Sequence, residues 1–233
     1  KYSLLRNYPA STTICAYGQT ILYELCRRLS NSCTLININT DGVAFIPEND
    51  EYKRIWEQWE KDFNLTLEED EFDYWIQTDV NNYIARNGDE ITVKGGDVNR
   101  YHDDSFFRNN DARILDIALV DKLIYNKDVL DTLMENLDKP YLYQYILQAG
   151  NTYKGTFDDD DNQYDKVNRV FAAKTGDFRL YKKRQDGGLV RFPELPDKMF
   201  LWNDDTNAIE DFASKIDLNH YYQTINKRLE RWL

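Results

Sequence analysis

The sequence contains few histidines and cysteines, two residue types that are common in catalytic and metal centres. It has two histidines, His102 and His220, and three cysteines among 233 residues. The histidines are far apart and each lies in a polar stretch, so no nucleophile–base–acid arrangement is indicated. Cys15, Cys26 and Cys33 are odd in number and lack the spacing of zinc ligands. Reduced thiols in a cytosolic compartment are therefore expected.

Other signals are also missing. No glycine-rich phosphate loop of the Walker or dinucleotide type is present. No apolar run reaches bilayer length and no secretory signal is present, so we expect no membrane partner. A cytoplasmic location follows, in the cytoplasm of the host cell if the protein is viral. The net charge of −12 opposes general nucleic-acid binding, so any such site must be a local basic patch.

The composition is that of a folded protein. Hydrophobic residues make up 42% of the chain, and 17 Tyr and 5 Trp argue against disorder. The length suffices for one large domain or two small ones.

The first hundred residues predict an α+β layer pattern. Residues 11–30 and 50–63 show helical periodicity, and residues 71–79 alternate as a strand. Residues 81–96 predict a hairpin that turns at Asn87-Gly88. The first helix is expected to bury a stripe that comprises Ile14, Tyr17, Ile21, Leu25 and Leu29. The second is expected to have an aromatic core face that comprises Tyr52, Ile55, Trp56, Trp59 and Phe63.

The second half begins with a predicted pair of helices, over residues 111–126 and 127–136. Residues 141–150 are ambiguous by periodicity. The acidic run from Asp158 fails the calcium-loop pattern, because Gln163 stands where glycine is needed, so a solvated turn is favoured. Residues 166–184 predict a hairpin that turns at Thr175-Gly176 and has a basic second strand. Residues 217–233 predict a final helix whose buried side carries Tyr222, Ile225, Leu229 and Trp232.

One stretch, "LININTDGVAFIP" from Leu35 to Pro47, carries the main chemical question. Asp-Gly between two β-type runs predicts a hairpin with Asn39 and Asp41 at its tip. Turn chemistry alone accounts for these residues. The alternative is that Asp41 is a metal ligand at a rigid tip. Together with Lys94 and the basic strand 182–184, such a ligand suggests phosphoryl transfer on a polyanion.

Four segments in order resemble the C-terminal palm and thumb portion of a family B DNA polymerase, most closely the bacteriophage versions. "NYPASTTICAYGQTILYEL" is similar to the palm helix that follows the fingers. "ININTDGVAF" resembles the palm hairpin whose usual core is Asp-Thr-Asp-Ser. "EQWEKDFNLTLEEDEFDYWIQTDVNNYIARNGDEITVKGG" resembles the palm segment that ends in Lys-x-Tyr and Lys-Gly elements facing the primer–template duplex. "FFRNNDARILDIALVDKLI" looks like the entry into the thumb.

The resemblance implies an α+β fold in two parts. Residues 1–100 would be the C-terminal part of the palm, an antiparallel sheet portion with flanking helices. Residues 101–233 would be a mostly helical thumb with a basic β-hairpin.

The implied function is DNA-directed DNA synthesis during phage replication, by magnesium-dependent nucleotidyl transfer to a primer 3′ hydroxyl. Asp41 matches the hairpin aspartate that holds the catalytic ions, of which the complete enzyme has two Mg²⁺. Asn39 stands where the family usually has another aspartate, and as a neutral amide it can only orient water or the hairpin. The partners would be primer–template DNA and, through an N-terminal part of the enzyme, deoxynucleoside triphosphates.

The resemblance also implies DNA contacts. Tyr83 matches the tyrosine of Lys-x-Tyr, whose lysine is replaced by Asn81, with Arg86 as a substitute charge. Lys94 and Gly95 match Lys-Gly, and further phosphate contacts are expected from Arg169, Lys182, Lys183 and Arg184. The bland alternatives stay open: a surface lysine, a core tyrosine, a solvated charge run, and an Arg169 paired with an acidic neighbour.

The family's other metal-binding aspartate and its fingers lysine lie upstream of the segments matched here, and no exonuclease domain is recognised. The chain alone is therefore expected to be inactive, as a fragment, a split-gene product or one domain of a longer protein. Two other classes remain as alternatives: a non-catalytic duplex-binding or scaffold subunit derived from a polymerase, and an unrelated acidic α+β interaction protein.

Overall fold

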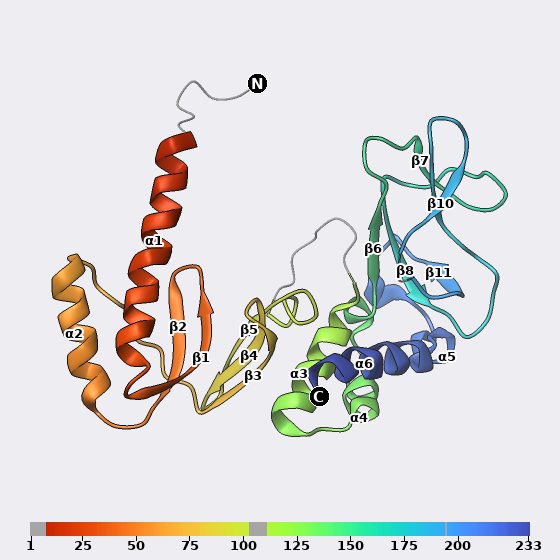
Figure 1. The fold of residues 1–233 in the computed structure, drawn as a ribbon. Helices are drawn as coiled ribbons and strands as arrows, with labels where there is room; N and C mark the ends of the chain where they lie inside the picture. The colour runs from red at the N-terminus through yellow and green to blue at the C-terminus, as the bar shows by residue number, and fades with distance from the viewer. Residues whose placement is uncertain (1–7, 103–110, 194) are drawn as a thin grey trace. The chain divides into compact units, whose positions relative to one another are not determined.

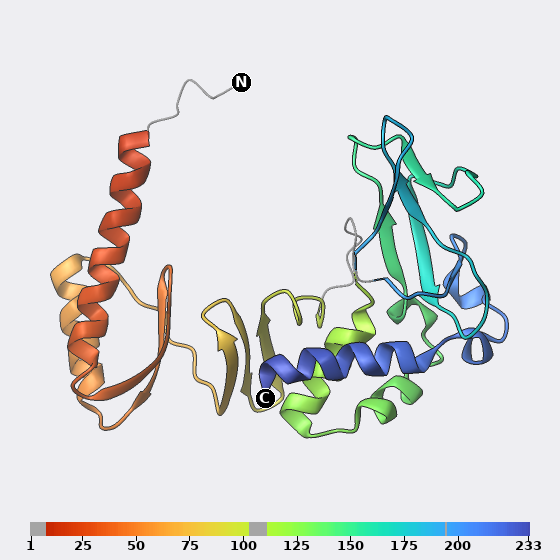
Figure 2. The same cartoon turned by 45° about the vertical axis from the view of Figure 1, so that its right-hand side comes forward.

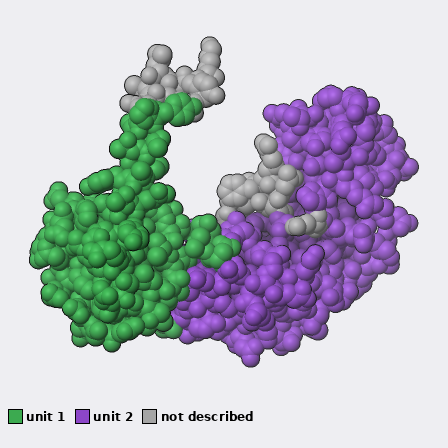
Figure 3. Space-filling view, viewed as in Figure 1, with its two compact units in different colours: residues 1–73, 79–81 green, residues 74–78, 82–233 purple. Residues whose placement is uncertain are grey.

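The structure is a computed structural model that describes residues 8–102, 111–193 and 195–233. The chain divides into two compact units (Figure 3), so the mixed α and β composition is distributed over two separate bodies. Unit 1 comprises residues 1–73 and 79–81, and unit 2 comprises residues 74–78 and 82–233. The boundary expected near residue 100 lies inside unit 2, because Tyr74, Ile76 and Val93 pack against the core of that unit.

Unit 1 is a helix, a hairpin and a second helix (Figure 1). The predicted hairpin is confirmed, since the two strands pair antiparallel with Asn39 opposite Gly42. Thr40 and Asp41 form its two-residue tip, and Thr40 has a positive φ of 22°. The elements are α1 (Tyr8–Leu29), β1 (Cys33–Asn39), β2 (Gly42–Pro47) and α2 (Glu51–Phe63).

A small core joins these elements. Leu25 and Leu29 of α1, Cys33 of β1 and Trp59 of α2 are its buried members. The Trp59 indole also donates a hydrogen bond to the backbone carbonyl of Ile21, at 3.1 Å, so the polar edge of the ring is satisfied. The predicted core face of α2 is confirmed for Trp59, Tyr52, Ile55 and Phe63, whereas Trp56 is not part of this core.

The buried stripe predicted for α1 is correct only in its second half. Leu25 and Leu29 are buried, but Ile14 and Tyr17 are 72% and 61% exposed. Helical periodicity shows which residues share a face but not how far along the helix a partner surface extends. In unit 1 the hairpin and α2 lie along the C-terminal half of α1 (Figure 1).

We expect the two halves of α1 to respond differently to truncation. Leu25→Ala should lower the free energy of opening of unit 1 by about 2–5 kcal/mol, because it leaves a cavity in a small core. Ile14→Ala, on the exposed half of the same helix, should change it by less than about 0.5 kcal/mol. Native-state hydrogen exchange of the β1 and β2 amides measures both. Equal effects would contradict the exposure of the N-terminal half.

Unit 2 begins with a three-stranded antiparallel sheet, in the order β3–β4–β5. The hairpin predicted over residues 81–96 is confirmed, with Asn87 opposite Glu90 and Gly88 at φ +58° in the turn. The strands are β3 (Tyr74–Asp79), β4 (Asn82–Asn87) and β5 (Glu90–Lys94). Tyr74 and Ile76 alternate toward the core, as the sequence predicted for this strand.

Helices and two further sheets complete unit 2. The helix α6 packs against α3, α4 and β8 (Figures 1 and 2). The predicted helical pair is confirmed; residues 106–110 of the segment that resembles a thumb entry lie outside the described residues. The helices are α3 (Arg113–Tyr125), α4 (Val129–Glu135), α5 (Phe212–Lys215) and α6 (Leu218–Trp232), with short 3₁₀ turns η1 (Pro140–Leu142) and η2 (Thr206–Ala208).

The second half contains more strand than expected, because six strands form among its described residues beside the helices. They make two three-stranded antiparallel sheets, ordered β11–β8–β6 and β10–β9–β7. The ambiguous segment 141–150 contains η1 and β6. The strands are β6 (Tyr145–Gln148), β7 (Gly155–Phe157), β8 (Val167–Ala172), β9 (Tyr181–Lys183), β10 (Leu189–Arg191) and β11 (Met199–Leu201).

The hairpin predicted to turn at Thr175-Gly176 is also wrong. Strands β8 and β9 belong to different sheets, and β9 pairs instead with β10. The turn that joins them contains Gly187 at φ +94°, and the Arg184 amide donates to the Gly188 carbonyl at 2.8 Å. The sequence holds a second turn signal, Asp186-Gly187. The loop that it closes between β9 and β10 is shorter than the one that a turn at Thr175-Gly176 would close between β8 and β9. The basic hairpin therefore exists with a different partner strand.

The acidic loop after β7 is a self-contained turn, as predicted. The carboxylate of Asp158 accepts hydrogen bonds from the backbone amides of Asp160 and Asn162, at 3.0 and 2.9 Å. It also accepts from the Tyr164 hydroxyl at 2.9 Å. These donors use the oxygen atoms that a calcium ion would need, so the loop is held by its own amides.

The helix α6 buries a slightly different face from the one predicted. Tyr221, rather than Tyr222, is fully buried, and its hydroxyl donates to the Tyr143 carbonyl at 2.7 Å. Ile225, Leu229 and Trp232 are buried as expected. Arg228 is also buried, and periodicity missed it because charged residues are rarely inside without partners.

Arg228 has these partners. Its guanidinium donates to the carboxylate of Asp116 at 2.9 Å and to that of Asp111 at 2.6 Å. The other oxygen of Asp116 accepts from the Arg100 amide at 2.9 Å. Burial raises the pKa of the Asp116 carboxyl to about 7, although Arg228 acts in the opposite direction.

This raised pKa predicts a pH dependence of stability. Between about pH 4 and 7 the folded protein holds a proton on Asp116 that the unfolded chain has lost, so the free energy of unfolding should fall as pH rises. Asp116→Asn removes the titrating group and should flatten this part of the profile, although it lowers stability overall. Denaturant unfolding at a series of pH values measures the slope. An unchanged slope in the variant would contradict this assignment.

Candidate functional site

The hairpin tip of unit 1 presents Asp41 to solvent. Asp41 follows Thr40 between β1 and β2, and its side chain is exposed. Because the two strands are paired up to Asn39 and Gly42, the tip is short and its position relative to the hairpin is fixed. An exposed carboxylate on a short turn is available to a cation or to a donor on another molecule.

Asn39 holds the tip against the segment 79–81 of the same unit. Its amide nitrogen donates to the Val80 carbonyl at 3.1 Å and to the Asn81 side-chain oxygen at 3.0 Å. Its own oxygen accepts from the Thr40 hydroxyl at 2.9 Å. An ionised aspartate has no hydrogen to donate, so at this position it would face two acceptors without a bond. The local geometry therefore favours asparagine.

The described residues do not form a metal site by themselves. No three His, Cys, Asp or Glu side chains in residues 8–102, 111–193 and 195–233 gather as a possible ion-binding group. Mg²⁺ is usually held by one or two protein carboxylates together with waters and phosphate oxygens. Asp41 can supply one such ligand.

A second group of predicted residues lies on one face of the β3–β4–β5 sheet in unit 2. Tyr83 and Lys94 are opposite each other on paired strands. The Lys94 side chain is exposed, whereas Tyr83 is half-buried and stacks on Trp75 of β3. The two ring centroids are 4.3 Å apart with an interplanar angle of 18°. Tyr83 is thus not a core tyrosine of the kind left open above.

The backbone conformation at position 95 and the neighbouring side chain of Asn82 require a glycine there. Gly95 has φ +116°, and a Cβ there would lie 2.0 Å from the side-chain oxygen of Asn82. That oxygen accepts a hydrogen bond from the Gly96 amide at 3.1 Å. Gly95 therefore makes room for Asn82, which accounts for this glycine without a bound polymer. Arg86 lies over the Tyr74 ring, with its guanidinium carbon 5.7 Å from the centroid.

The basic strand β9 is largely occupied by internal contacts. The ammonium of Lys182 lies 5.1 Å from the Tyr153 ring centroid and 5.2 Å from that of Phe192. Lys183 forms an ion pair with Asp161 and lies over Phe157. Arg184, by contrast, is exposed. The basic run Lys182–Arg184 thus presents one exposed side chain, that of Arg184 just after β9, rather than three.

Arg169 also bonds within the protein. Its guanidinium donates to the backbone carbonyls of Asn203 and Asp204, at 2.7 and 3.2 Å. Both carbonyls belong to the segment that follows β11. This contact fixes that segment to β8.

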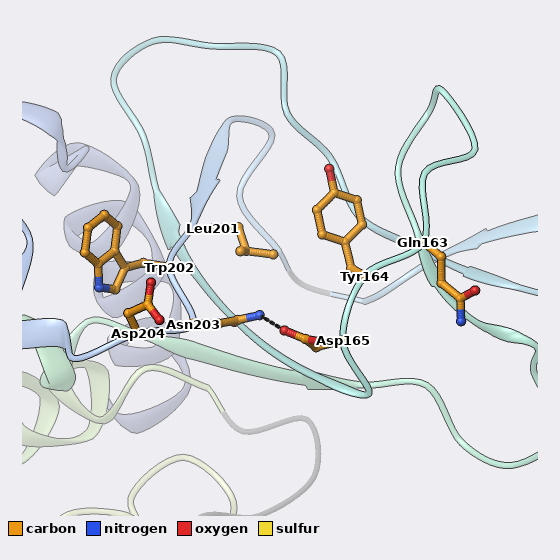
Figure 4. A pocket seen from close by; sticks show the side chains of 7 residues that line it. All are labelled: Gln163, Tyr164, Asp165, Leu201, Trp202, Asn203 and Asp204. Atoms are coloured by element: carbon orange, nitrogen blue, oxygen red, sulfur yellow. Dashed lines mark hydrogen bonds between the residues drawn. The ribbon is translucent and has the colours of Figure 1, made fainter.

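That segment borders the pocket in Figure 4, which sequence analysis did not predict. The cavity has a volume of about 630 Å³. Asn203 crosses it to donate to Asp165 at 2.9 Å, and Tyr164 and Trp202 contribute rings (Figure 4). Asp204 adds a second carboxylate and no basic residue lines it, so the pocket does not suit a phosphate.

The histidines take part in two unrelated contacts. A ring nitrogen of His102 is 2.6 Å from the Ile91 carbonyl oxygen. His220 is hydrogen-bonded to the Tyr145 hydroxyl at 2.9 Å, and burial lowers its pKa. These two contacts are separate from each other. The three cysteines are free thiols.

The structure therefore brings Tyr83 and Lys94 together, and it places Lys182–Arg184 on another sheet of unit 2. Asp41 and Asn39 belong to unit 1. The residue that sequence analysis missed is Trp75. Its alternation with Tyr74 and Ile76, which point toward the core, was the signal that could have placed it on the face of Tyr83.

Comparison of the sequence with protein-family models and with curated proteins finds no match to either. Among the described residues, no helix combines the length and apolar character that crossing a membrane demands.

Proposed function

We propose that this chain is the palm-hairpin and thumb portion of a family B DNA polymerase, acting in magnesium-dependent nucleotidyl transfer to a primer 3′ hydroxyl. The observation that carries the proposal is the exposed Asp41 on a two-residue tip between paired strands. The ordered resemblance of four sequence segments to that family supports it.

Each residue has a defined task under this proposal. Asp41 supplies one carboxylate to a magnesium site that is completed by residues outside this chain. Asn39 fixes the tip, through its bonds to Val80 and Asn81. When bound, magnesium ions stabilise the attacking and leaving oxygens of the transfer. Lys94 and Arg184 contact phosphates of the primer–template, which gives affinity without sequence preference.

The proposed role of Asp41 is tested in a joined polypeptide, in which this chain follows the fingers and the first palm strand of a family B DNA polymerase. Asp41→Asn should lower primer extension by several orders of magnitude and leave DNA binding nearly unchanged, because a lost metal ligand acts on the transition state. Asn39→Ala should be milder. Asp89→Asn is the matched control, since Asp89 is an exposed carboxylate in the turn of the other confirmed hairpin. Near-normal extension by Asp41→Asn would refute the assignment.

The proposed DNA contacts are tested by salt dependence. Lys94→Ala and Arg184→Ala should each weaken duplex binding equally for all sequences and reduce the slope of log K against log salt by about 0.9. Lys183→Ala is the matched control, because its ammonium is paired with Asp161, and it should change the slope less. Fluorescence anisotropy with a labelled primer–template measures each slope. Unchanged slopes for Lys94 and Arg184 would contradict their role.

A second candidate is a non-catalytic duplex-binding or scaffold subunit derived from a polymerase. The bonds that Asn39 makes as a neutral amide favour it, because a second carboxylate is missing from the tip. Wild-type joined polypeptide that binds duplex DNA in a salt-dependent manner but shows no templated extension would support this candidate instead.

A further inference from the structure

The sheet β3–β4–β5 has two chemically different faces. Tyr74, Ile76 and Val93 pack against the core of unit 2. Strand alternation and the register place Trp75 and Tyr83 on the opposite face, with Lys94 across from Tyr83. This second face, which we call the aromatic face, is defined by Trp75, Gln77, Tyr83, Thr92 and Lys94.

The aromatic face has an ordered arrangement. The rings of Trp75 and Tyr83 are nearly parallel, at 18°, with centroids 4.3 Å apart. The Trp75 indole nitrogen donates a hydrogen bond to the Gln77 side-chain oxygen at 3.0 Å. This bond restricts the rotation of the Trp75 ring and helps to keep it parallel to Tyr83. Both rings are half-buried, so part of each stays accessible. A bound ring would therefore meet side chains whose rotamers are already held, at a low cost in conformational entropy.

The cross-strand neighbour of Tyr83 is a cation, and the exposed carboxylate of Glu90 lies on the same face further along β5. Lys94 is exposed and is the cross-strand neighbour of Tyr83, and such neighbours have Cβ atoms about 5 Å apart. Thr92, also exposed, lies on the same face two residues before Lys94. A flat aromatic stack beside one ammonium complements a flat ring carried on an anionic backbone. This is the chemistry of a nucleobase with its phosphate.

We propose that the aromatic face binds an unstacked nucleobase of a single-stranded polynucleotide, which stacks on the Trp75–Tyr83 pair while Lys94 contacts the adjacent phosphate. The inference rests on the proposed function in using Tyr83 and Lys94, and extends it from the paired duplex to an unpaired strand. Base stacking tolerates every base, so the face reads no sequence. Trp75 becomes a nucleic-acid contact that the resemblance did not supply.

The test compares two single strands of equal charge on the full chain. The probes are the octanucleotide dT8 and an abasic strand of the same length, at one salt concentration. Wild-type protein should bind dT8 more tightly than the abasic strand. Trp75→Leu keeps an apolar side chain but no ring, and should weaken dT8 binding between about fivefold and about a hundredfold. Binding of the abasic strand should stay unchanged.

Three variants control this result. Trp202→Leu makes the same substitution at another half-buried tryptophan of unit 2 and should leave the dT8 preference intact. Trp75→Phe restores a ring and should recover most of the preference. Lys94→Ala should weaken both strands by the same factor. Circular dichroism checks the fold, and if Trp75→Leu does not fold, the comparison of the two strands on wild type and Trp75→Phe still decides.

Equal wild-type affinity for dT8 and the abasic strand would overturn the inference, as would equal losses from Trp75→Leu and Trp202→Leu. Either result would make the aromatic face a contact for protein or a purely structural stack. If duplex binding keeps its salt slope in that case, the proposed function stands without this inference. A clear base preference without templated synthesis by the joined polypeptide would instead remove the polymerase proposal and leave a single-strand-binding face.

Discussion

Unit 2 depends on the buried guanidinium of Arg228. A charge that is 7% exposed must be matched, and Arg228 reaches the carboxylates of Asp116 and Asp111 from helix α6. Asp116 in turn accepts the amide of Arg100, so one network joins the end of the chain to the segment between β5 and α3. Removing one partner of such a pair costs about 3–5 kcal/mol, because the other charge stays buried. The Tyr221 hydroxyl of the same helix accepts from the Ala172 amide at 3.1 Å and so connects α6 to β8.

The same need for matching decides how much positive charge reaches the surface. Lys183 is paired with Asp161, Lys182 lies over two rings, and Arg169 donates to two carbonyls. These three predicted phosphate contacts have internal partners, so a run of basic residues in the sequence overstates the charge that is free to bind. Of the predicted contacts in unit 2, Lys94 and Arg184 are exposed.

The parts of the fold that could be predicted from the sequence are those set by local signals. The turn signals Asp41-Gly42 and Asn87-Gly88 located two hairpins, whose observed tips are Thr40-Asp41 and Gly88-Asp89, because a hairpin turn is determined within a few residues. The pairing of β9 could not be predicted, since two turn signals, Thr175-Gly176 and Asp186-Gly187, compete and sheet partners decide between them. The same distinction between local and long-range signals applies to the candidate site. Asp41 was found from its turn, whereas the partners of Asn39 lie 41 and 42 residues away along the chain.

Those partners change the meaning of the two departures from the polymerase pattern. Under the proposed function, Asn39 stands for an aspartate and Asn81 for a lysine, and these two residues are joined by a hydrogen bond of 3.0 Å. Exchanging an acid and a base together leaves the summed charge of the pair unchanged, while exchanging either one alone would leave an unmatched charge beside the tip. The bond runs from the Asn39 amide nitrogen to the Asn81 side-chain oxygen and needs no charge on either residue. Under the proposed function the neutral pair is thus a coupled replacement, and it does not by itself indicate a lost activity. It leaves Asp41 as the carboxylate of the tip, with its support provided by hydrogen bonds rather than by a neighbouring charge.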